Sequence, residues 1–233
     1  MLYLYHINQI GKKRNVINTM KEDKCLTCSS CGVYSCFNNN EEKYPEFCLT
    51  KSLDQDLLQE SSDVYEKDET LGNIARISAE IESDFYGQKT RVEETVEFIK
   101  RINAKRVGIA TCVGLLHETR LFTKILDKEG IEYYTVGCKV GAVDKTEIGI
   151  PKEKKLNKGC GHESMCNPVL QAKILNEQKT DFNIMIGLCV GHDSLFLKHV
   201  EAPTTVLIVK DRVLYHNPVA ALYGSAGMYS RFK

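Results

Sequence analysis

The chain has 233 residues and a formal net charge of zero, with 31 Lys and Arg against 31 Asp and Glu. This balance provides no broad cationic field, so nucleic acid is not an expected partner. No apolar run approaches the roughly 20 residues that a membrane helix needs, and the first basic residues follow the apolar ones, the reverse of a secretory signal. We therefore expect a cytoplasmic protein that does not bind membranes.

The first segment of the chain is rich in cysteine. Residues 1–19 are expected to be a leader or disordered extension, residues 20–66 a Cys-rich metal-binding segment with its connector, and residues 67–233 an α/β domain. The Cys-rich part has few large aliphatic residues, so it cannot build a core unaided, and a bound metal could take the place of one. Ten cysteines without an export signal indicate a reducing compartment, where clustered cysteines bind metal or react more often than they form disulfides.

The spacing of the first cysteines predicts a metal. It reads C-x2-C-x2-C-x4-C from Cys25, close to the C-x2-C-x2-C-x3-C run of bacterial ferredoxins, although the last gap is one residue longer and no proline follows. A zinc-ribbon-like set that uses the first two cysteines, the fourth and the next one along the chain is the alternative. The candidate ligands are Cys25, Cys28, Cys31, Cys36 and Cys48.

Further along the chain, the hydrophobic pattern predicts regular elements. The polar stretch 51–69 is expected to be a connector with at most one helical turn, and apolar residues at three- and four-residue steps predict two helices after it. The expected elements are helices over 70–86 and 90–103, strand 105–112, helix 115–129, strand 131–138, an irregular stretch 139–166, helix 167–178, strand 182–189, helix 191–200 and a hairpin over 204–218. This alternation predicts an α/β fold with a mostly parallel, doubly wound sheet and a C-terminal hairpin, preceded by a small Cys-rich metal-binding segment.

Three predicted strands end in a cysteine: Cys112, Cys138 and Cys189. The carboxyl ends of parallel strands share one edge, where open α/β folds bind ligands, so these thiols should lie near one another. A fourth thiol could come from Cys166 at a helix start, or from Cys160 before it. The set contains no C-x-x-C pair, which favours an iron–sulfur cluster over a closed zinc site. Each of these cysteines could instead be a small buried apolar residue.

Polar residues and glycines near the same edge are candidates for chemistry and binding. His192, His162 and Glu163 are candidate catalytic residues, as proton donors or acceptors. The candidates for contact with a cofactor or anionic ligand are Gly114, Gly141, Gly191, Asp193 and Ser194. Asp193 and Ser194 could equally cap the helix that follows, and His117 and Glu118 are further possible metal ligands. The chain has no P-loop, G-x-G-x-x-G or G-x-S-x-G, which disfavours nucleotide binding by the usual routes and hydrolase chemistry.

The chain resembles a prokaryotic family of domains of unknown function that are described as predicted metal-binding proteins. The motifs that carry the resemblance span about residues 24–224: CLTCSSCGVYSC, GIATCVGL, CKVG, GHESMCNPVLQA, GLCVGHDSLF and APTTVLIVKDRVLYHNPVAALY. The resemblance implies metal binding through the cysteines already named. It identifies no metal, reaction, substrate or partner.

Three functions are compatible with these observations. The first is an oxygen-sensitive iron–sulfur protein with one or two clusters, of the 4Fe–4S type, that acts on an unknown redox partner or a small-molecule substrate. The second is a zinc-stabilised ligand-binding or regulatory module. The third is a thiolate enzyme in which Cys189 is the nucleophile. The first is our expectation.

Overall fold

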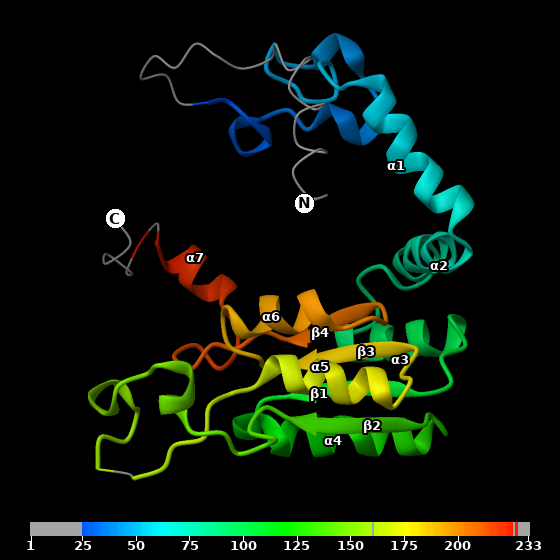
Figure 1. Cartoon of the computed structure of the whole chain (residues 1–233). Helices are drawn as coiled ribbons and strands as arrows, with labels where there is room; N and C mark the ends of the chain where they lie inside the picture. The colour runs from blue at the N-terminus through cyan, green and yellow to red at the C-terminus, as the bar shows by residue number, and fades with distance from the viewer. Residues whose placement is uncertain (1–24, 160, 226, 228–233) are drawn as a thin grey trace, which may run out of the picture. The chain divides into compact units, whose positions relative to one another are not determined.

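The computed structural model describes residues 25–159, 161–225 and 227. The chain divides into two compact units, the N-terminal unit Met1–Lys67 and the α/β unit Asp68–Lys233. The expected leader over residues 1–19 and the candidate ligand Cys160 lie outside the described residues. Figure 1 labels the helices and strands of both units.

The N-terminal unit has little regular structure in its Cys-rich part. Three short 3-10 helices, η1 (Cys28–Ser30), η2 (Ser35–Asn38) and η3 (Glu41–Lys43), precede one α-helix, α1 (Gln55–Lys67). Of the described residues in this unit, Ser35 alone is buried. Most of its larger apolar side chains are exposed, with Phe37 at 95%, while Phe47 and Leu53 are half-buried. The described part of this unit therefore has no hydrophobic core, as its composition indicated.

Helix α1 corrects the expectation of a connector with one helical turn. It covers thirteen residues, none of them buried. Asp63 accepts a hydrogen bond from Gln59 and forms an ion pair of 2.6 Å with Lys67, both at a four-residue spacing. Such pairs, together with Gln, Glu and Leu at many positions, stabilise this helix, whose apolar residues Leu57, Leu58, Val64 and Tyr65 recur on one face but are exposed.

The α/β unit contains a four-stranded sheet in the order β2-β1-β3-β4, with every neighbouring pair parallel. Its strands are β1 (Val107–Thr111), β2 (Tyr133–Gly137), β3 (Phe182–Ile186) and β4 (Thr204–Ile208). Every residue of β1 and β3 is buried, whereas the outer strands β2 and β4 are largely half-buried. Central parallel strands have both faces covered, which explains their continuous apolar runs. The predicted α/β fold is confirmed.

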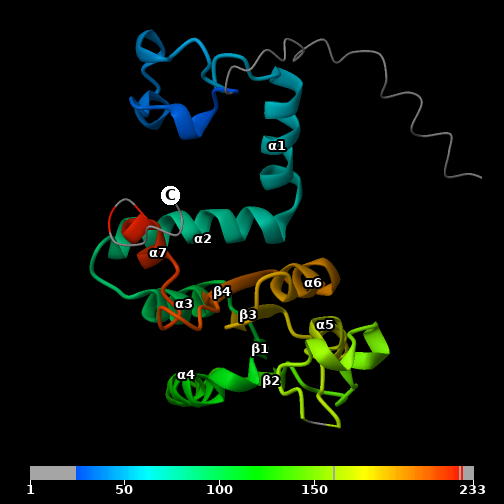
Figure 2. The same cartoon turned by 90° about the vertical axis from the view of Figure 1, so that its left-hand side faces the viewer.

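Helices cover both faces of this sheet. Figure 2 shows α3 (Arg91–Arg101) and α4 (Leu116–Lys128) on one side of the strands, and α5 (Pro168–Glu177) and α6 (His192–His199) on the other. Helix α2 (Glu69–Phe85) packs against α3. Because α4, α5 and α6 connect successive parallel strands, all four strands end at one edge. The connection after β1 leaves on one face of the sheet and the connection after β3 leaves on the other (Figure 2). In open α/β folds the crevice between two such strands, at their carboxyl ends, is the expected ligand-binding site.

The two central strands pack closely through one glycine. Gly108 pairs with Asn183 across β1 and β3, and a Cβ atom at Gly108 would lie 1.9 Å from Asn183 Oδ1. The Asn183 side chain is fully buried, and its Oδ1 accepts a hydrogen bond of 2.8 Å from Thr180. Gly108 therefore provides the room for a buried amide on the adjacent strand.

The predicted C-terminal hairpin is wrong for the described residues. After β4 the chain forms turns in which Asp211 Oδ1 accepts hydrogen bonds from the backbone N–H groups of Val213 and Leu214, both at 2.8 Å. This carboxylate ends the extended run before a second strand begins. The outer edge of β4 is also occupied, because Arg91 Nε donates to the carbonyl of Val206 at 2.9 Å. A short helix that the pattern did not predict, α7 (Val219–Ser225), follows the turns.

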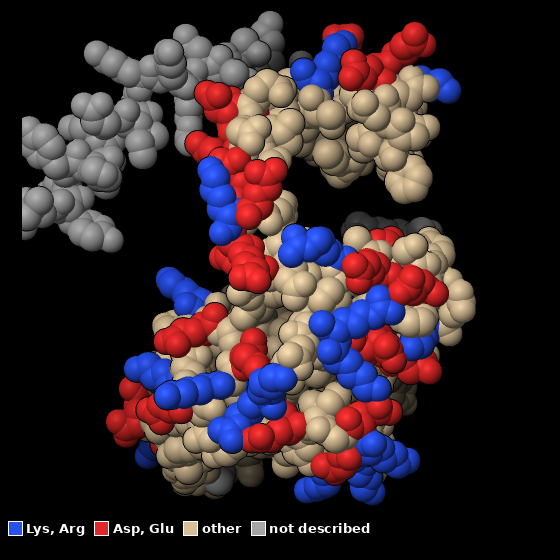
Figure 3. All heavy atoms as spheres, turned by 90° about the vertical axis from the view of Figure 1, so that its right-hand side faces the viewer, with Lys and Arg blue, Asp and Glu red and all other residues tan. Residues whose placement is uncertain are grey.

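The surface of the α/β unit has mixed charge. In Figure 3, Lys and Arg side chains are interspersed with Asp and Glu on the face drawn. Among the described residues, no helix combines the length and apolar character that crossing a bilayer requires.

Candidate functional site

Two cysteines extend the strands to the carboxyl edge of the sheet. Cys112 directly follows β1 and donates its backbone N–H to Ile186 at 3.0 Å, and Cys138 directly follows β2 and donates to Thr111 at 2.8 Å. Their side chains are 8% and 2% exposed. These backbone hydrogen bonds hold both residues in the sheet, side by side on neighbouring strands.

Cys166 reaches the same place because the loop between β2 and α5 closes on itself. An antiparallel bridge joins Asp144 to Ser164, and Met165 donates its backbone N–H to Val143 at 2.7 Å. Asn167 then donates its backbone N–H to the carbonyl of Cys138 at 2.8 Å, and its side chain caps α5. The start of α5 is thereby fixed beside the end of β2.

A buried ion pair holds this loop together. Lys155, with a side chain that is 1% exposed, lies 2.8 Å from the Asp144 carboxylate and also donates to the carbonyl of Gly161. Lys155 is the main reason that the pKa of Asp144 is held well below its usual range, and hydrogen bonds from Thr146 add to the effect. This pair holds together the described parts of the loop on either side of residue 160.

The candidate catalytic residues of this loop contact other parts of it. His162 lies 2.9 Å from the hydroxyl of Ser164 and 3.4 Å from the Asp144 carboxylate. Glu163 forms an ion pair with Lys145 and accepts from the backbone N–H of Asn157. These contacts give both residues a role in loop structure, and their catalytic role stays a prediction.

Three thiols meet at the edge, with Cys138 between Cys112 and Cys166. A hydrogen bond from the Cys138 thiol is the largest cause that lowers the pKa of Cys112 to about 5, and the Gly114 N–H and Lys210 contribute. The same thiol is the largest cause that lowers the pKa of Cys166 to about 5, with help from Lys139 and His192. The pKa of Cys138 is raised, mainly by Cys112 and then by Cys166, which places its thiol beside both of these sulfurs.

Cationic side chains that the sequence interpretation missed surround the thiols. Lys210 Nζ lies 3.4 Å from the position of a Cβ at Gly114, and Cys112 Sγ lies 3.8 Å from the same point, so Gly114 leaves room for this lysine beside the thiol. Lys139 directly follows Cys138 and donates to the carbonyl of Ser164. The carboxyl-edge rule applied to β4 would have found Lys210, since it follows that strand by two residues.

Cys189 has a different environment. The strand expected over 182–189 ends at Ile186, because Gly187 adopts a left-handed conformation with φ 64° and turns the chain. Cys189 therefore lies three residues beyond the strand, where its Sγ accepts a hydrogen bond of 3.0 Å from Arg212. Arg212 is thus the hydrogen-bond partner of this sulfur.

The polar residues at the start of α6 divide into two kinds. Asp193 accepts from the backbone N–H of Ser194, and Ser194 donates to the carbonyl of Gly191; neither side chain caps α6, whose N-cap residue is Gly191. His192 Nδ1, in contrast, is buried and has no hydrogen-bond partner among the described residues. Since His192 also lowers the pKa of Cys166, its ring lies near the thiols.

The remaining candidate glycine, Gly141, shapes the start of the loop. It has a φ of 84°, and a Cβ there would lie 2.9 Å from Leu170 Cδ2. Both the conformation and the contact favour glycine. Gly141 is thus explained by the path of the loop toward α5.

The cysteines of the N-terminal unit are accessible. Cys25, Cys28 and Cys36 are exposed, and Cys31 and Cys48 are half-buried. Burial acts to raise the pKa of Cys48, but hydrogen bonds from the backbone of Lys51 and Thr50 outweigh it and lower that pKa. Cys36 and Cys48 both contribute to the raised pKa of Tyr44, which places both of them near one tyrosine.

The donor set at the sheet edge suits a thiophilic metal. Three thiols in contact, none in a disulfide, lie beside a buried imidazole nitrogen without a partner. Within residues 25–159, 161–225 and 227, no group of three or more His, Cys, Asp or Glu already surrounds a point as metal ligands do. Side chains of the three cysteines would have to rotate from their mutual contacts toward a bound ion.

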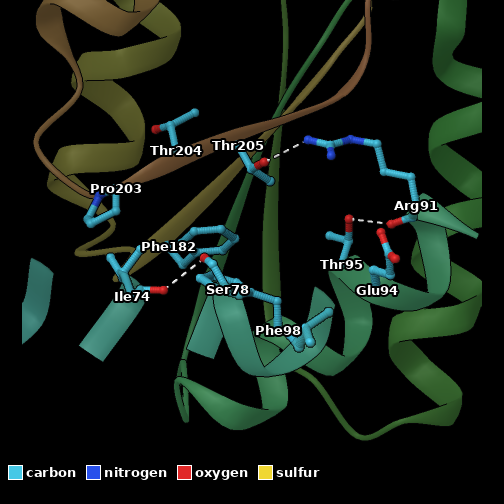
Figure 4. Close-up of a pocket in the computed structure, with 11 residues that line it drawn as sticks. Ile74, Ser78, Arg91, Glu94, Thr95, Phe98, Phe182, Pro203, Thr204 and Thr205 are labelled. Carbon is cyan, nitrogen blue, oxygen red and sulfur yellow. Dashed lines mark hydrogen bonds between the residues drawn. The ribbon is translucent and has the colours of Figure 1, made fainter. Parts of the chain in front are cut away.

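A separate hollow of about 320 Å³ lies at the opposite end of the strands. Figure 4 shows it between α2, α3 and the start of β4, with Phe98, Phe182 and Ile74 among its walls. Its polar groups bond to protein: Thr95 donates to the carbonyl of Arg91, and Ser78 to that of Ile74. The chemistry-bearing side chains are at the carboxyl edge, so this hollow is not the candidate site.

Two comparisons with known proteins found matches that cover most of the chain. Residues 48–207 match a family described as "Protein of unknown function (DUF1847)". The chain is also 46% identical over 198 residues to uncharacterized protein MJ0455 of Methanocaldococcus jannaschii, a match that covers 85% of this chain and 94% of that protein. The match to the family begins at Cys48 and includes the four described cysteines of the α/β unit. The chain belongs to the DUF1847 family, a family of proteins of unknown function.

Proposed function

We propose that this protein is a cysteine-ligated metalloprotein with one centre in the N-terminal unit and a second at the carboxyl edge of the sheet. The contact among Cys112, Cys138 and Cys166 carries the proposal. Ionising all three of these neighbouring thiols is costly unless a cation compensates the charge, as the raised pKa of Cys138 indicates. A metal ion that displaces the remaining protons removes this cost.

The residues at the edge define a ligand set. Cys112, Cys138 and Cys166 would provide three sulfurs, and His192 Nδ1 or Cys189 would provide a fourth donor. Lys139 and Lys210 would compensate the negative charge of a metal bound by several thiolates. A bound iron–sulfur cluster would supply one-electron chemistry at this edge.

The N-terminal unit supports the first centre by a different argument. Its described residues bury no apolar side chain, so hydrophobic packing does not explain how its turns are held. Metal ligation by cysteines is the usual substitute in segments of this size. The ferredoxin-like spacing favours a 4Fe–4S cluster in this unit, and we place the protein in the cytoplasm, where its thiols stay reduced.

Metal analysis of protein prepared without oxygen tests the proposal. We expect iron and acid-labile sulfide with a broad visible absorption, at about four irons for each cluster. Cys138→Ser should remove the metal of the sheet-edge centre only, and Cys25→Ser that of the N-terminal centre only, with circular dichroism to check folding. Cys189→Ser, compared with Cys138→Ser, tests whether Cys189 is the fourth ligand of the sheet-edge centre.

The result also distinguishes iron from zinc. Tetrahedral zinc with bonds of about 2.3 Å separates its sulfur ligands by about 3.8 Å, a distance at which thiols also touch. One zinc that depends on Cys138 would therefore assign a single ion to the sheet edge. Protein without stoichiometric metal, or with a metal content that neither variant changes, would refute the proposal.

The contact between Cys189 and Arg212 supports a second candidate function, that of a thiolate enzyme. The guanidinium, 3.0 Å from the sulfur, would hold the nucleophile in position. Iodoacetamide should then label Cys189 faster than the other cysteines, and Arg212→Gln should slow that labelling. Equal labelling rates for Cys189 in both proteins would exclude this function.

A further inference from the structure

A groove of about 730 Å³ lies between the start of α3, the first turn of α4 and the second half of β4. Its apolar surface comes from residues 206–209 and Pro218, and its polar groups come from Arg91, Glu118, Tyr215 and His216. The groove is apart from the hollow of Figure 4, with which it shares only Arg91.

Glu118 is the unusual residue of this groove. It is half-buried, and its Oε2 atom is buried without a hydrogen-bond partner among the described residues. Among the described residues that line the groove, Glu118 alone carries a carboxylate. A buried carboxylate oxygen without a donor is unfavourable, and a donor that enters the groove would recover that free energy.

Two of the other polar groups of the groove, Arg91 and His216, already have partners, and Tyr215 is exposed to solvent. Arg91 donates from Nε to the carbonyl of Val206 and from Nη2 to the hydroxyl of Thr205, so its guanidinium is directed at the edge of β4. His216 Nδ1 accepts from the backbone N–H of Asp211 at 3.1 Å, which leaves the proton of the neutral ring on Nε2. Neither contact involves Glu118, so its carboxylate remains the acceptor available to a ligand.

The groove adjoins the cysteines through one stretch of chain. Val209 lines the groove, Lys210 lies beside Cys112, and Arg212 bonds to Cys189. The next turn then returns to the groove with His216. A ligand held by Glu118 would therefore be bound at the same edge of the sheet as the thiols.

We propose that this groove binds a small molecule that carries a primary amine on an apolar body. The ammonium group donates to Glu118 Oε2, and the apolar part packs on residues 206–209 and Pro218. Ammonium is favoured over a neutral donor because a charge-assisted hydrogen bond to a carboxylate is about twice as strong. The assignment rests on the groove and on Glu118, and it does not depend on a metal.

Calorimetric titration of the full chain with isoamylamine tests this site. Isoamyl alcohol and 4-methylpentanoate have similar apolar bodies and replace the ammonium by a neutral group and by an anion. We expect saturable binding of the amine, with both analogues at least tenfold weaker. Glu118→Gln should weaken amine binding at least tenfold, whereas Glu147→Gln, at an exposed carboxylate of the loop, should leave it unchanged.

Three results would overturn the proposal. The first is the absence of saturable amine binding to the unmodified chain. The second is equal binding to the Glu118→Gln variant. The third is an affinity for isoamyl alcohol that matches that for the amine, which would make the groove an apolar surface without a role for the carboxylate.

Discussion

Replacing Gly108 by alanine tests the packing of the two central strands. The new Cβ would lie 1.9 Å from Asn183 Oδ1, where contacts below 3.0 Å do not form, and 3.0 Å from Leu175 Cδ1. Both neighbours are fully buried, so Asn183 must move by roughly 1 Å within a filled core. Its hydrogen bond from Thr180 is then weakened.

The expected cost follows from these two effects. Overpacking contributes about 1–3 kcal/mol, and the weakened hydrogen bond contributes about 1 kcal/mol. The sum of about 2–4 kcal/mol is a large part of a typical stability of about 5–15 kcal/mol. It should lower the melting temperature by on the order of 10 °C in a unit of this size.

Urea unfolding followed by circular dichroism measures this cost. Gly161→Ala is the matched control, because a Cβ there has no neighbour within 4 Å and we expect no loss of stability. Asn183→Ala should remove the clash, so the double variant with Gly108→Ala should cost less than the two single variants together. A Gly108→Ala protein as stable as the parent, or a strictly additive double variant, would contradict this account of the core.

Three further outcomes are expected. Lys155 lowers the pKa of Asp144 below its ordinary 3.8. The ionised carboxylate therefore stabilises the fold above pH 3.8, and this stabilisation is lost as the pH falls. Asp144→Asn should reduce the difference between the urea midpoints at pH 7 and pH 3. Gly141→Ala should cost about 1–2 kcal/mol in the same assay from its left-handed conformation alone, and an unchanged midpoint would be inconsistent with the φ of 84°. Arg91→Met should uncover the carbonyl of Val206 on edge strand β4 and increase self-association in light scattering, while the exposed Arg120→Met should not.

Local patterns were enough to predict most of the regular elements. The helix expected over 70–86 is α2, and the strand expected over 105–112 contains β1, because a buried face imposes its period on the sequence wherever the element forms. Two predictions were wrong for different reasons. Helix α1 buries none of its residues, and its apolar stripe of Leu57, Leu58, Val64 and Tyr65 was missed within a polar stretch. The β-rich run after Ile208 is turned aside by hydrogen bonds to Asp211.

At the candidate site, the sequence predicts one part of the arrangement and not another. The order of strands and helices alone predicts that Cys112 and Cys138 lie at one edge of a parallel sheet, because every strand in such a sheet ends there. The sequence has no comparable signal for the contact between Cys138 and Cys166. That contact depends on a loop closed by the Asp144–Lys155 pair and by a backbone hydrogen bond from Asn167.

What the amino-acid sequence determined by itself is the sheet, its cysteine-bearing edge and an N-terminal segment too polar to form a core. Only the tertiary structure decided which sulfurs touch and which cations lie beside them. The pattern placed Cys189 at the end of its strand, but Gly187 ends β3 early, and Cys189 lies three residues beyond the strand, where it accepts a hydrogen bond from Arg212. The physical reason is that burial is encoded residue by residue along an element, whereas contacts between distant loops depend on a few backbone conformations and ion pairs that form only when the chain is folded.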